Sequence, residues 1–331
     1  MSVDAVLSIQ GLKTYFFTRS GIARAVDDVS LEVRPGETLG IVGESGSGKS
    51  VTFLSVLRLV PPPGKTVSGE IIFEGQDLLQ MPLQKLRNIR GKRIGIVFQD
   101  PMTSLNPFLR IGDQVAETLL VHEKISRNKA LDRAVGILEK VGISDAASRL
   151  EDYPHRFSGG MRQRVMIASA LIANPSLLIA DEPTTALDVT IQAQVLDLFT
   201  HIKSEFSTAI VLITHNLGIV AGMADHAAVM YSGRVVEYAK TTDLFAHPRH
   251  PYTLALLKTL PRPGDMQPSV QPIPGMPPDL TCLPRGCSFF DRCAFRMDRC
   301  LEESPPLISF GPGHQASCWV DIEKGQNPVS E

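Results

Sequence analysis

The sequence lacks three things: cysteine before residue 282, an apolar run long enough to cross a bilayer, and an excess of charge of one sign. Lys and Arg number 33 against 35 Asp and Glu, so the net charge is −2 and the basic surplus typical of nucleic-acid-binding proteins is missing. A membrane helix needs about 20 consecutive apolar residues, so we expect that the chain does not span a membrane by itself. Residues 1–10 have neither the basic start nor the apolar core of a signal peptide. We therefore expect a cytoplasmic location.

A glycine-rich motif, Gly-Glu-Ser-Gly-Ser-Gly-Lys-Ser, occupies residues 43–50. It follows the apolar run 38–42 and precedes the helical pattern 51–60, which is the context that a phosphate-binding loop requires. The glycines let backbone N–H groups approach phosphate oxygens, and the helix N-terminus adds partial positive charge. Lys49 can contact the β- and γ-phosphates, and the Ser50 hydroxyl can ligate Mg²⁺. The predicted nucleotide-binding residues are Gly43, Glu44, Ser45, Gly46, Ser47, Gly48, Lys49, Ser50 and Val51. An ordinary glycine turn is the alternative, but it leaves the full set of motif positions unexplained.

The remaining pattern is that of an α/β protein. With 331 residues, 43% of them hydrophobic and 21% charged, the chain can bury a full α/β core and still carry an appendage. Strands are predicted at residues 7–9, 25–33, 38–42, 69–75, 94–98, 177–182, 208–214, 227–230 and 234–238. Helices are predicted at residues 51–60, 112–123, 127–141 and 159–173. The strand 177–182 is apolar until two final acids, which suits a parallel sheet covered on both faces.

Those two acids, Asp181 and Glu182, lie where open α/β sheets bind ligands, at the C-terminal end of a strand. Asp181 can hold Mg²⁺ directly or through water, and Glu182 can polarise an attacking water. His215 ends the next apolar strand, where a neutral imidazole could contact a γ-phosphate or order that water. A lone histidine at a strand end is more often structural, and two solvated acids at a strand end are plausible in isolation. The phosphate-loop motif upstream favours the functional interpretation.

Two weaker signals accompany these motifs. Ser158 precedes two glycines and the predicted helix 159–173, so it is a good N-cap that leaves N–H groups exposed at a helix start. Most such segments are only helix caps. Upstream, one of the rings of Tyr15 and Phe16 could stack on an adenine, or both could belong to a buried cluster on an edge strand.

Taken in order and spacing, six elements resemble the ATP-binding cassette of an ABC transporter over roughly residues 5–240. They are the phosphate loop, Gln99, Ser158-Gly159-Gly160, Asp181-Glu182, Ala186-Leu187-Asp188 and His215. The resemblance implies an α/β fold of the ABC type of P-loop nucleoside triphosphatase, with a mixed sheet core, an antiparallel β subdomain and an α-helical subdomain at about residues 100–172. Further segments resemble the ATPase subunits of dipeptide and oligopeptide importers, a subfamily that includes nickel importers. These segments are residues 100–107, 153–155, 184–190 and 249–253.

The resemblance assigns roles within one subunit. Glu182 would be the general base, and His215 would hold the γ-phosphate and the water. Phe16 is the best candidate to stack on adenine, with Tyr15 second. Three residues would bind Mg²⁺ and with it the nucleotide: Ser50, Gln99 and Asp181. Because every catalytic position is filled, we expect the chain to hydrolyse ATP.

The resemblance also implies that two cassettes pair head to tail, with each ATP between one phosphate loop and the other subunit's signature segment. The residues expected to act on the opposite site are Ser158, Gly159, Gly160, Met161 and Asp188. The signature departs from the commonest Leu-Ser-Gly-Gly-Gln at Phe157 and Met161. Methionine is usual at the second position in the peptide branch, so neither change argues for an inactive site.

No membrane domain is fused to the cassette, which is the layout of importers assembled from separate chains. The resemblance implies two permease subunits, on which residues 100–172 would dock, an extracytoplasmic solute-binding protein, and a second ATPase in a heterodimer rather than a homodimer. The chain would lie at the cytoplasmic face of the cytoplasmic membrane and couple ATP binding and hydrolysis to uptake of dipeptides or oligopeptides. Nickel or another small solute is the first alternative cargo.

Two functions of other classes are disfavoured. A cassette acting on nucleic acid or ribosomes would resemble two cassettes in one chain or one split by a coiled coil, whereas this chain has one phosphate loop, no heptad run and no basic stripe. An iron–sulfur redox protein with a vestigial cassette would have lost Glu182 or His215, and both are present.

Beyond the cassette, which we place at residues 1–240, residues 241–331 are predicted to form a C-terminal extension. Residues 261–278 contain seven prolines and have the composition of a linker. All five cysteines follow this linker, and disulfides do not suit a cytosolic chain, so the clustered thiols favour a metal. The four expected ligands are Cys287, Cys293, Cys300 and Cys318. Cys282 has no assigned role.

The cysteine spacing lacks the paired Cys-x-x-Cys knuckles of most structural zinc sites. The extension resembles the cysteine-containing tail of peptide-importer ATPases, in which four cysteines can hold a [4Fe–4S] cluster, and four thiolates are the ligand set of such a cluster. We rank this cluster first, zinc second and free buried thiols third. A structural or regulatory role is expected, because the cassette motifs are complete without it.

Overall fold

The computed structural model describes residues 5–185, 187–260 and 272–322, which form two compact units. The first unit takes its described residues from Met1–Val6, Val33–Glu37 and Gln80–Ile213. The second takes them from Leu7–Glu32, Thr38–Leu79 and Thr214–Glu331. The expected division at residue 240 stays a prediction. Residues 261–271 of the proline-rich linker and Ala186 lie outside the described residues.

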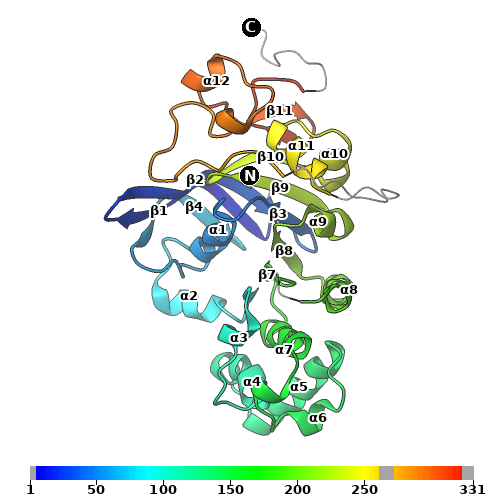
Figure 1. Ribbon diagram of the computed structural model, residues 1–331. Coiled ribbons are helices and arrows are strands. Elements are labelled where there is room, and N and C mark those ends of the chain that lie inside the picture. The colour runs from blue at the N-terminus through cyan, green and yellow to red at the C-terminus, as the bar shows by residue number, and fades with distance from the viewer. Residues whose placement is uncertain (1–4, 186, 261–271, 323–331) are drawn as a thin grey trace. The chain divides into compact units, whose positions relative to one another are not determined.

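The second unit is built mainly of strands (Figure 1). An antiparallel set has the order β2-β1-β4-β5 and consists of β1 (Leu7–Thr18), β2 (Gly21–Val33), β4 (Gly64–Phe73) and β5 (Gln76–Asp77). Another set has the order β11-β12-β10-β9-β3 and consists of β3 (Thr38–Val42), β9 (His226–Tyr231), β10 (Arg234–Lys240), β11 (Ile308–Gly311) and β12 (His314–Ala316). Strand β3 is parallel to β9, and the β9–β10 hairpin is antiparallel. The C-terminal extension thus contributes β11 and β12 beside β10.

Short helices complete the second unit. They are α1 (Lys49–Val56), α9 (Leu217–Met223), α10 (Thr241–Ala246), α11 (Pro251–Lys258), η2 (Phe290–Arg292) and α12 (Arg299–Glu302). The sequence pattern predicted that the first helix extends to residue 60, which was wrong: α1 ends at Val56, and Arg58 has a left-handed φ of 51° that no α-helix accommodates. Strand β1 is longer than predicted and includes Tyr15 and Phe16.

The first unit contains three parallel strands in the order β8-β7-β6, which are β6 (Ile94–Val97), β7 (Leu177–Asp181) and β8 (Ala209–Thr214). Its helices are α2 (Leu83–Ile89), α3 (Pro101–Ser104), α4 (Ile111–His122), α5 (Arg127–Lys140), α6 (Ala146–Arg149), η1 (Pro154–Arg156), α7 (Gly159–Leu171) and α8 (Val189–Phe206). The residues of β7 before Asp181 are completely buried, which confirms the parallel sheet expected from its apolar run.

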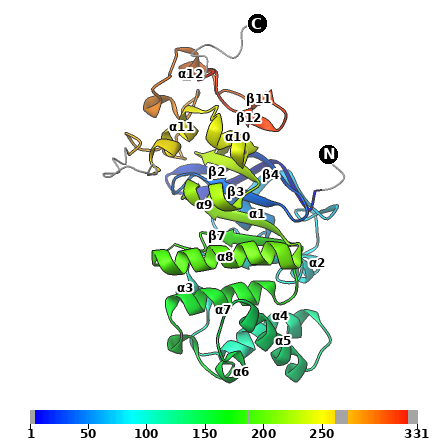
Figure 2. The same ribbon diagram turned by 90° about the vertical axis from the view of Figure 1, so that its right-hand side faces the viewer.

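Within this unit α4, α5, α6 and α7 form a helical group in both views (Figures 1 and 2). Ala130 and Ala134 give α5 a fully buried small-residue face, and Ser126 caps its N-terminus by accepting the Lys129 N–H. This group occupies the interval predicted to be the helical subdomain. Among the described helices, none is both long and apolar enough to cross a membrane.

Candidate functional site

The phosphate loop has the sharp, glycine-dependent path that the motif predicts. Gly43 has φ +154°, and a Cβ on it would lie 2.2 Å from the Met230 carbonyl oxygen of β9. Gly48 has φ +99°, and a Cβ there would lie 2.2 Å from the Ala25 carbonyl oxygen of β2. Both contacts are with backbone, which cannot move aside as a flexible side chain could. Glycine is therefore required at both positions.

Lys49 begins α1 and reaches back across the loop. Its Nζ donates to the carbonyl oxygens of Gly43 at 2.8 Å and Glu44 at 2.9 Å, and the residue is only 5% exposed. These two bonds hold the ammonium against the backbone of the loop. An incoming phosphate can replace these acceptors without a large movement of the side chain.

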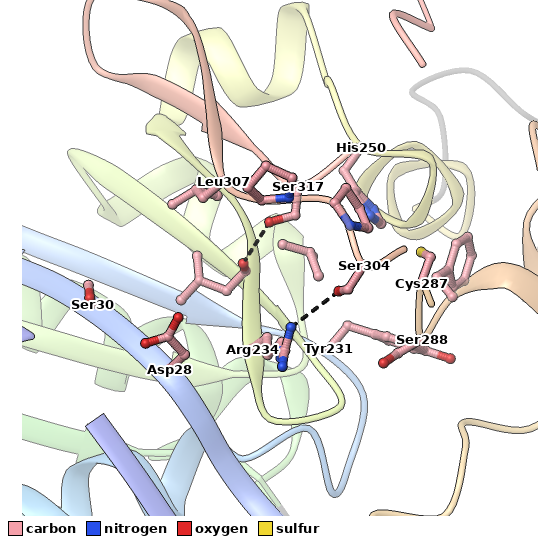
Figure 3. A pocket seen from close by; sticks show the side chains of 15 residues that line it. Asp28, Ser30, Tyr231, Arg234, His250, Cys287, Ser288, Ser304, Leu307 and Ser317 are labelled. Carbon is pink, nitrogen blue, oxygen red and sulfur yellow. Dashed lines mark hydrogen bonds between the residues drawn. The ribbon is translucent and has the colours of Figure 1, made fainter. Parts of the chain in front are cut away.

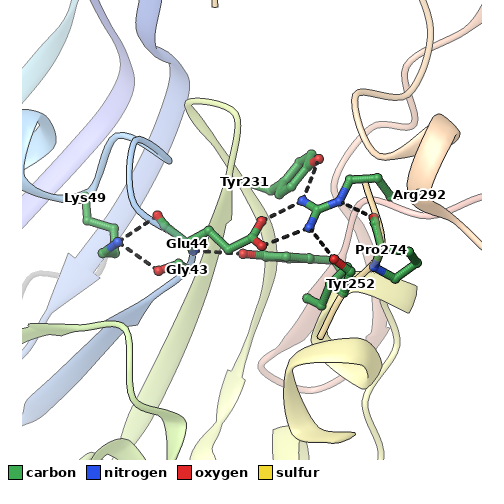
Figure 4. Close-up of polar contacts among 8 residues, drawn as sticks. Gly43, Glu44, Lys49, Tyr231, Tyr252, Pro274 and Arg292 are labelled. Carbon is green, nitrogen blue, oxygen red and sulfur yellow. Dashed lines mark hydrogen bonds and ion pairs between the residues drawn. The ribbon is translucent and has the colours of Figure 1, made fainter. Parts of the chain in front are cut away.

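The second residue of the loop, Glu44, is held by two residues that the sequence did not single out for this role (Figure 4). Its backbone N–H donates to the Tyr252 hydroxyl at 2.9 Å. Its carboxylate accepts two hydrogen bonds from Arg292, at 2.6 and 2.9 Å. These bonds to Glu44 raise the pKa of Arg292 above its usual value. Tyr252 belongs to a segment noted for its resemblance, but its local pattern gave no sign of contact with the loop.

The acid that ends β7 is held on two sides. Glu182 Oε2 accepts hydrogen bonds from Gln99 Nε2 at 3.0 Å and from the Thr185 hydroxyl at 2.9 Å. The residue has a left-handed φ of 46°, and its N–H donates to the Ile213 carbonyl oxygen. The structure therefore brings together the predicted general base and one predicted Mg²⁺ ligand. Asp181 precedes Glu182 at the end of the strand.

The predicted signature segment starts α7. Ser158 is the N-cap, and its hydroxyl accepts the Met161 N–H at 3.3 Å. A Cβ on Gly159 would meet nothing within 4 Å, whereas a Cβ on Gly160 would lie 2.7 Å from Ile191 Cγ2 of α8. Asp188 is an exposed N-cap of α8 and accepts the Ile191 N–H at 2.9 Å. The structure confirms the expected helix start at Ser158, whereas the helix start at Asp188 was not predicted.

The two candidate adenine-stacking residues lie on β1. Tyr15 donates its hydroxyl to Asp27 at 2.7 Å, and burial, followed by this hydrogen bond, raises the pKa of Tyr15 to about 12. Phe16 is half-buried, and its ring carbon lies 2.8 Å from where a Cβ of Gly64 would be. The remaining candidate catalytic residue, His215, directly follows β8 and is exposed.

A buried polar network fixes the extension to the strands of the second unit. Glu237 of β10 is fully buried and accepts the backbone N–H groups of Arg249 at 2.7 Å and His250 at 2.9 Å. The His314 ring nitrogen lies 2.8 Å from the same carboxylate. His250 Nδ1 in turn accepts the Tyr252 N–H and starts α11, and burial lowers the pKa of His250 to about 3. Glu237 thereby places the helix that carries Tyr252.

Four cysteines come together in the extension. Cys287, Cys293, Cys300 and Cys318 line one cavity, which we call the cysteine pocket. Burial raises the pKa of the Cys287 thiol to about 11 and that of Cys318 to about 12. Among the described residues, however, no group of three or more His, Cys, Asp or Glu side chains could hold a metal ion as arranged. The structure thus brings the four predicted ligands into one cavity but does not show the predicted [4Fe–4S] cluster or zinc. Cys282 is exposed.

A second cavity, of about 210 Å³, lies between the β9–β10 hairpin and the extension (Figure 3). Arg234 donates to the Ser304 hydroxyl at 3.2 Å across it, and Ser317 donates to the Val235 carbonyl oxygen. Cys287 lines both this cavity and the cysteine pocket. No sequence signal pointed to this cavity, because its lining comes from segments far apart in the chain.

Comparison with known protein families gives two matches. Residues 26–185 match the family described as ABC transporter, and residues 236–300 match the one described as oligopeptide/dipeptide transporter, C-terminal region.

Similar proteins extend over nearly the whole chain. It is 51% identical to the probable peptide ABC transporter ATP-binding protein y4tR of Sinorhizobium fredii, over 97% of this chain and 96% of that protein. It is 47% identical to the oligopeptide transport ATP-binding protein OppD of Salmonella typhimurium, over 97% of this chain and 95% of that protein.

Similar solved structures cover the cassette part. The ATP-binding cassette MJ0796, solved as a dimer in a post-hydrolysis state with ADP and Pi, has a TM-score of 0.64 and 26% identity, over 71% of this chain and 98% of that one. CbiO1 of Clostridium perfringens, part of the transporter complex cbiONQ, has a TM-score of 0.62 and 28% identity, over 73% of this chain and 91% of that one. These likenesses confirm the predicted cassette fold.

Proposed function

The chain belongs to the family of ABC transporter ATP-binding proteins, is an ABC-type ATPase, and, we propose, powers an importer of dipeptides or oligopeptides. One observation carries the cargo class: relatives named for peptide transport are about half identical over 97% of this chain, including its C-terminal region. A cassette match alone would support any cargo, because the nucleotide chemistry is the same.

We propose the following roles in ATP hydrolysis, supported by contacts that lie within each unit. The phosphate loop is expected to bind the β- and γ-phosphates. The Lys49 ammonium, which donates to two carbonyl oxygens of the loop, would then contact these phosphates. Glu182 would take the proton of the attacking water, and Gln99 and Thr185 would orient its carboxylate. His215 would hold the γ-phosphate and the water. Mg²⁺ would be held by oxygen ligands from Ser50, Gln99 and Asp181, and would neutralise phosphate charge.

We propose that two cassettes pair head to tail. The exposed helix start at Ser158 and Gly159 supports this, because a helix N-terminus favours an anion such as a γ-phosphate. Gly160, Met161 and Asp188 would complete the contribution to the opposite site. We propose that the second cassette is a related ATPase rather than a second copy of this chain.

The expected partners are two permease subunits and an extracytoplasmic solute-binding protein. We propose that the helical group α4–α7 docks on the permeases at the cytoplasmic face of the membrane. Exposed apolar side chains on and before α4 support docking there: Phe108 is 86% exposed and Val121 is 70% exposed. When the two cassettes close around ATP, the permeases would change to the conformation that is open to the outside of the membrane.

We also propose that the cysteine pocket holds a [4Fe–4S] cluster, with zinc as the alternative. The support is the donor set: four thiols line one cavity, and four thiolates are what such a cluster or a structural zinc requires. Iron, acid-labile sulfide and zinc would be measured in protein purified without oxygen, with Cys318→Ser as the variant and Cys282→Ser as the control. Iron and sulfide lost only in Cys318→Ser would support the cluster. Absence of all three from the wild-type protein would refute both metals.

Uptake in cells tests the cargo. A strain whose only copy of this gene carries Glu182→Gln would be offered labelled dipeptide, a longer peptide and nickel. We expect peptide uptake to fall and nickel uptake to stay unchanged. A fall in nickel uptake alone would replace the peptide assignment with the metal-ion one, and no change in either would contradict both.

A further inference from the structure

Arg292 links the C-terminal extension to the nucleotide loop, although the two lie 248 positions apart in the chain. Its side chain is 3% exposed and makes a two-pronged ion pair with Glu44, whose side chain is 30% exposed. The guanidinium also donates to the Pro274 carbonyl oxygen at 3.0 Å and to the Tyr231 hydroxyl at 3.3 Å. A buried arginine with this many directed bonds has one favourable position.

The aromatic residues around Arg292 restrict its movement further. Tyr231 lies edge-on to Phe289, with ring centroids 5.3 Å apart, and Tyr231 and Tyr252 are 4.6 Å apart. Tyr252 is the residue whose hydroxyl accepts the Glu44 N–H. Tyr252 therefore holds the backbone of Glu44, and Arg292, which packs among the same aromatic residues, holds its side chain (Figure 4).

The segment that carries Arg292 is also part of the cysteine pocket. Arg292 ends η2, a single 3₁₀ turn directly before Cys293, and the Phe290 N–H that starts this turn donates to the Cys287 carbonyl oxygen at 3.1 Å. The Cys287 N–H in turn donates to the Cys300 carbonyl oxygen at 2.8 Å. A change in the pocket that shifts this turn must also shift the guanidinium that holds Glu44.

The ion pair between Arg292 and Glu44 also affects the charge of the phosphate loop. Glu44 is an acid within the loop that receives the phosphates, and like charges in one site repel. Arg292 neutralises this acid, and in Figure 4 its guanidinium and the Lys49 ammonium lie on opposite sides of Glu44. The carboxylate is thus turned away from the side of the loop where Lys49 lies.

We propose that the C-terminal extension regulates nucleotide binding: Arg292 is a positioning residue that holds the phosphate loop through Glu44 and couples it to the cysteine pocket. The inference rests on the ATPase activity and not on the cargo, so it stands or fails separately from peptide import. Nucleotide affinity and the order of the turn 287–293 are then linked, and each affects the other by the same factor.

Equilibrium binding of MgADP to the purified full-length protein tests the positioning role. We expect Arg292→Gln to bind MgADP roughly tenfold more weakly, because Glu44 is left unpaired. The double variant Glu44→Gln/Arg292→Gln should recover most of this loss, since it removes the unpaired charge as well. Arg299→Gln is the matched control, because Arg299 lies in the same extension and its ion pair is with Glu303, four residues further along the chain.

Wild-type affinity in Arg292→Gln, or losses that simply add in the double variant, would overturn the positioning role. Arg292→Lys covers the case in which the glutamine variant folds poorly. It keeps the charge but cannot form the two-pronged pair, so its affinity should lie between those of the wild type and Arg292→Gln at an unchanged unfolding midpoint.

Hydrogen–deuterium exchange tests the coupling, whatever the thiols bind. MgADP should slow exchange of the amides of residues 287–293 in the wild-type protein by roughly fivefold, and this protection should disappear in Arg292→Gln. Peptides from α5 serve as the reference. If MgADP leaves residues 287–293 unaffected in the wild type, or protects them equally in Arg292→Gln, the coupling is refuted.

Discussion

The phosphate loop and the signature segment are both glycine-rich helix starts, yet the structure supports them in different ways. The loop is held by its neighbours: the Gly233 N–H donates to the Ser47 carbonyl oxygen at 3.0 Å, and Tyr252 and Arg292 hold Glu44. The signature segment is held by its own cap at Ser158 and by the packing of Gly160 on Ile191. Its first two residues are exposed.

The two segments therefore differ in how far each is ordered for nucleotide binding before the nucleotide is present. The loop is held in one conformation by other groups of the same chain, so its N–H donors have fixed directions before the nucleotide binds. Because these donors are already ordered, binding costs little conformational entropy. The signature segment presents an exposed helix start that no described residue covers. Our proposal of a second cassette requires such a surface.

The largest effect is expected from Glu182→Gln, which separates binding from hydrolysis. The substituted amide keeps the size of the side chain but cannot accept a proton, so ATP turnover should fall by about 10²–10⁴ while nucleotide affinity stays near the wild-type value. Steady-state phosphate release and equilibrium binding measure the two quantities. Equal losses in both would mean that Glu182 supports the site and is not its base.

The next effect tests how rigidly the phosphate loop is held. Gly48→Ala places a Cβ 2.2 Å from the β2 backbone, so we expect loss of nucleotide binding and a lower free energy of unfolding. Gly46→Ala is the matched control, because φ is also positive there but nothing lies within 4 Å. It should cost only the left-handed penalty of about 1–2 kcal/mol. Calorimetry with and without MgADP compares the variants, and similar results would show that the contact with β2 is unimportant.

The signature segment allows the corresponding test with two adjacent glycines. Gly160→Ala should lower the free energy of unfolding by about 1–3 kcal/mol, because the new methyl meets Ile191 at 2.7 Å. Gly159→Ala meets no atom and should leave stability unchanged or slightly higher. Its ATPase rate should nevertheless fall if this helix start binds the opposite γ-phosphate. A Gly159→Ala protein with full activity would argue against that role.

The smallest expected effect concerns the hydrogen bond between Tyr15 of β1 and Asp27 of β2. The pKa of Tyr15 is raised to about 12, first by burial and then by its hydrogen bond to Asp27. In the unfolded chain a tyrosine ionises near pH 10. The neutral Tyr15 phenol therefore contributes fully to the free energy of unfolding below pH 10, and this contribution is lost between about pH 10 and 12.

Ultraviolet titration of the phenols would show this tyrosine as the difference between wild type and Tyr15→Phe. In Asp27→Asn its midpoint should move toward 10, since the acceptor carboxylate is gone. A midpoint that stays at about 12 would assign the shift to burial alone. Nucleotide affinity of Tyr15→Phe should stay within about twofold of wild type, because the ring is kept.

Much of the site could be predicted from the sequence because its determinants are local. A glycine at a position with positive φ, a serine before a helix and an apolar strand that ends in acids each act over a few residues, and all are present at Gly48, Ser158 and Asp181. The family resemblance assigned Gln99 to Mg²⁺, but its hydrogen bond to Glu182 was not predicted. The end of α1 was missed because residues 57–60 are apolar enough to continue a helix pattern, although the chain turns there.

The sequence by itself determined the cassette class, the phosphate loop and the catalytic candidates, because these depend on residue type and spacing along the chain. That Arg292 and Tyr252 support Glu44, and that Glu237 anchors the extension, became evident only from the folded chain. These contacts join segments up to 248 positions apart, and local pattern carries no information about such pairs. Chain folding brings them together because each buried charge needs a partner, and the nearest suitable partner in space is far away in sequence.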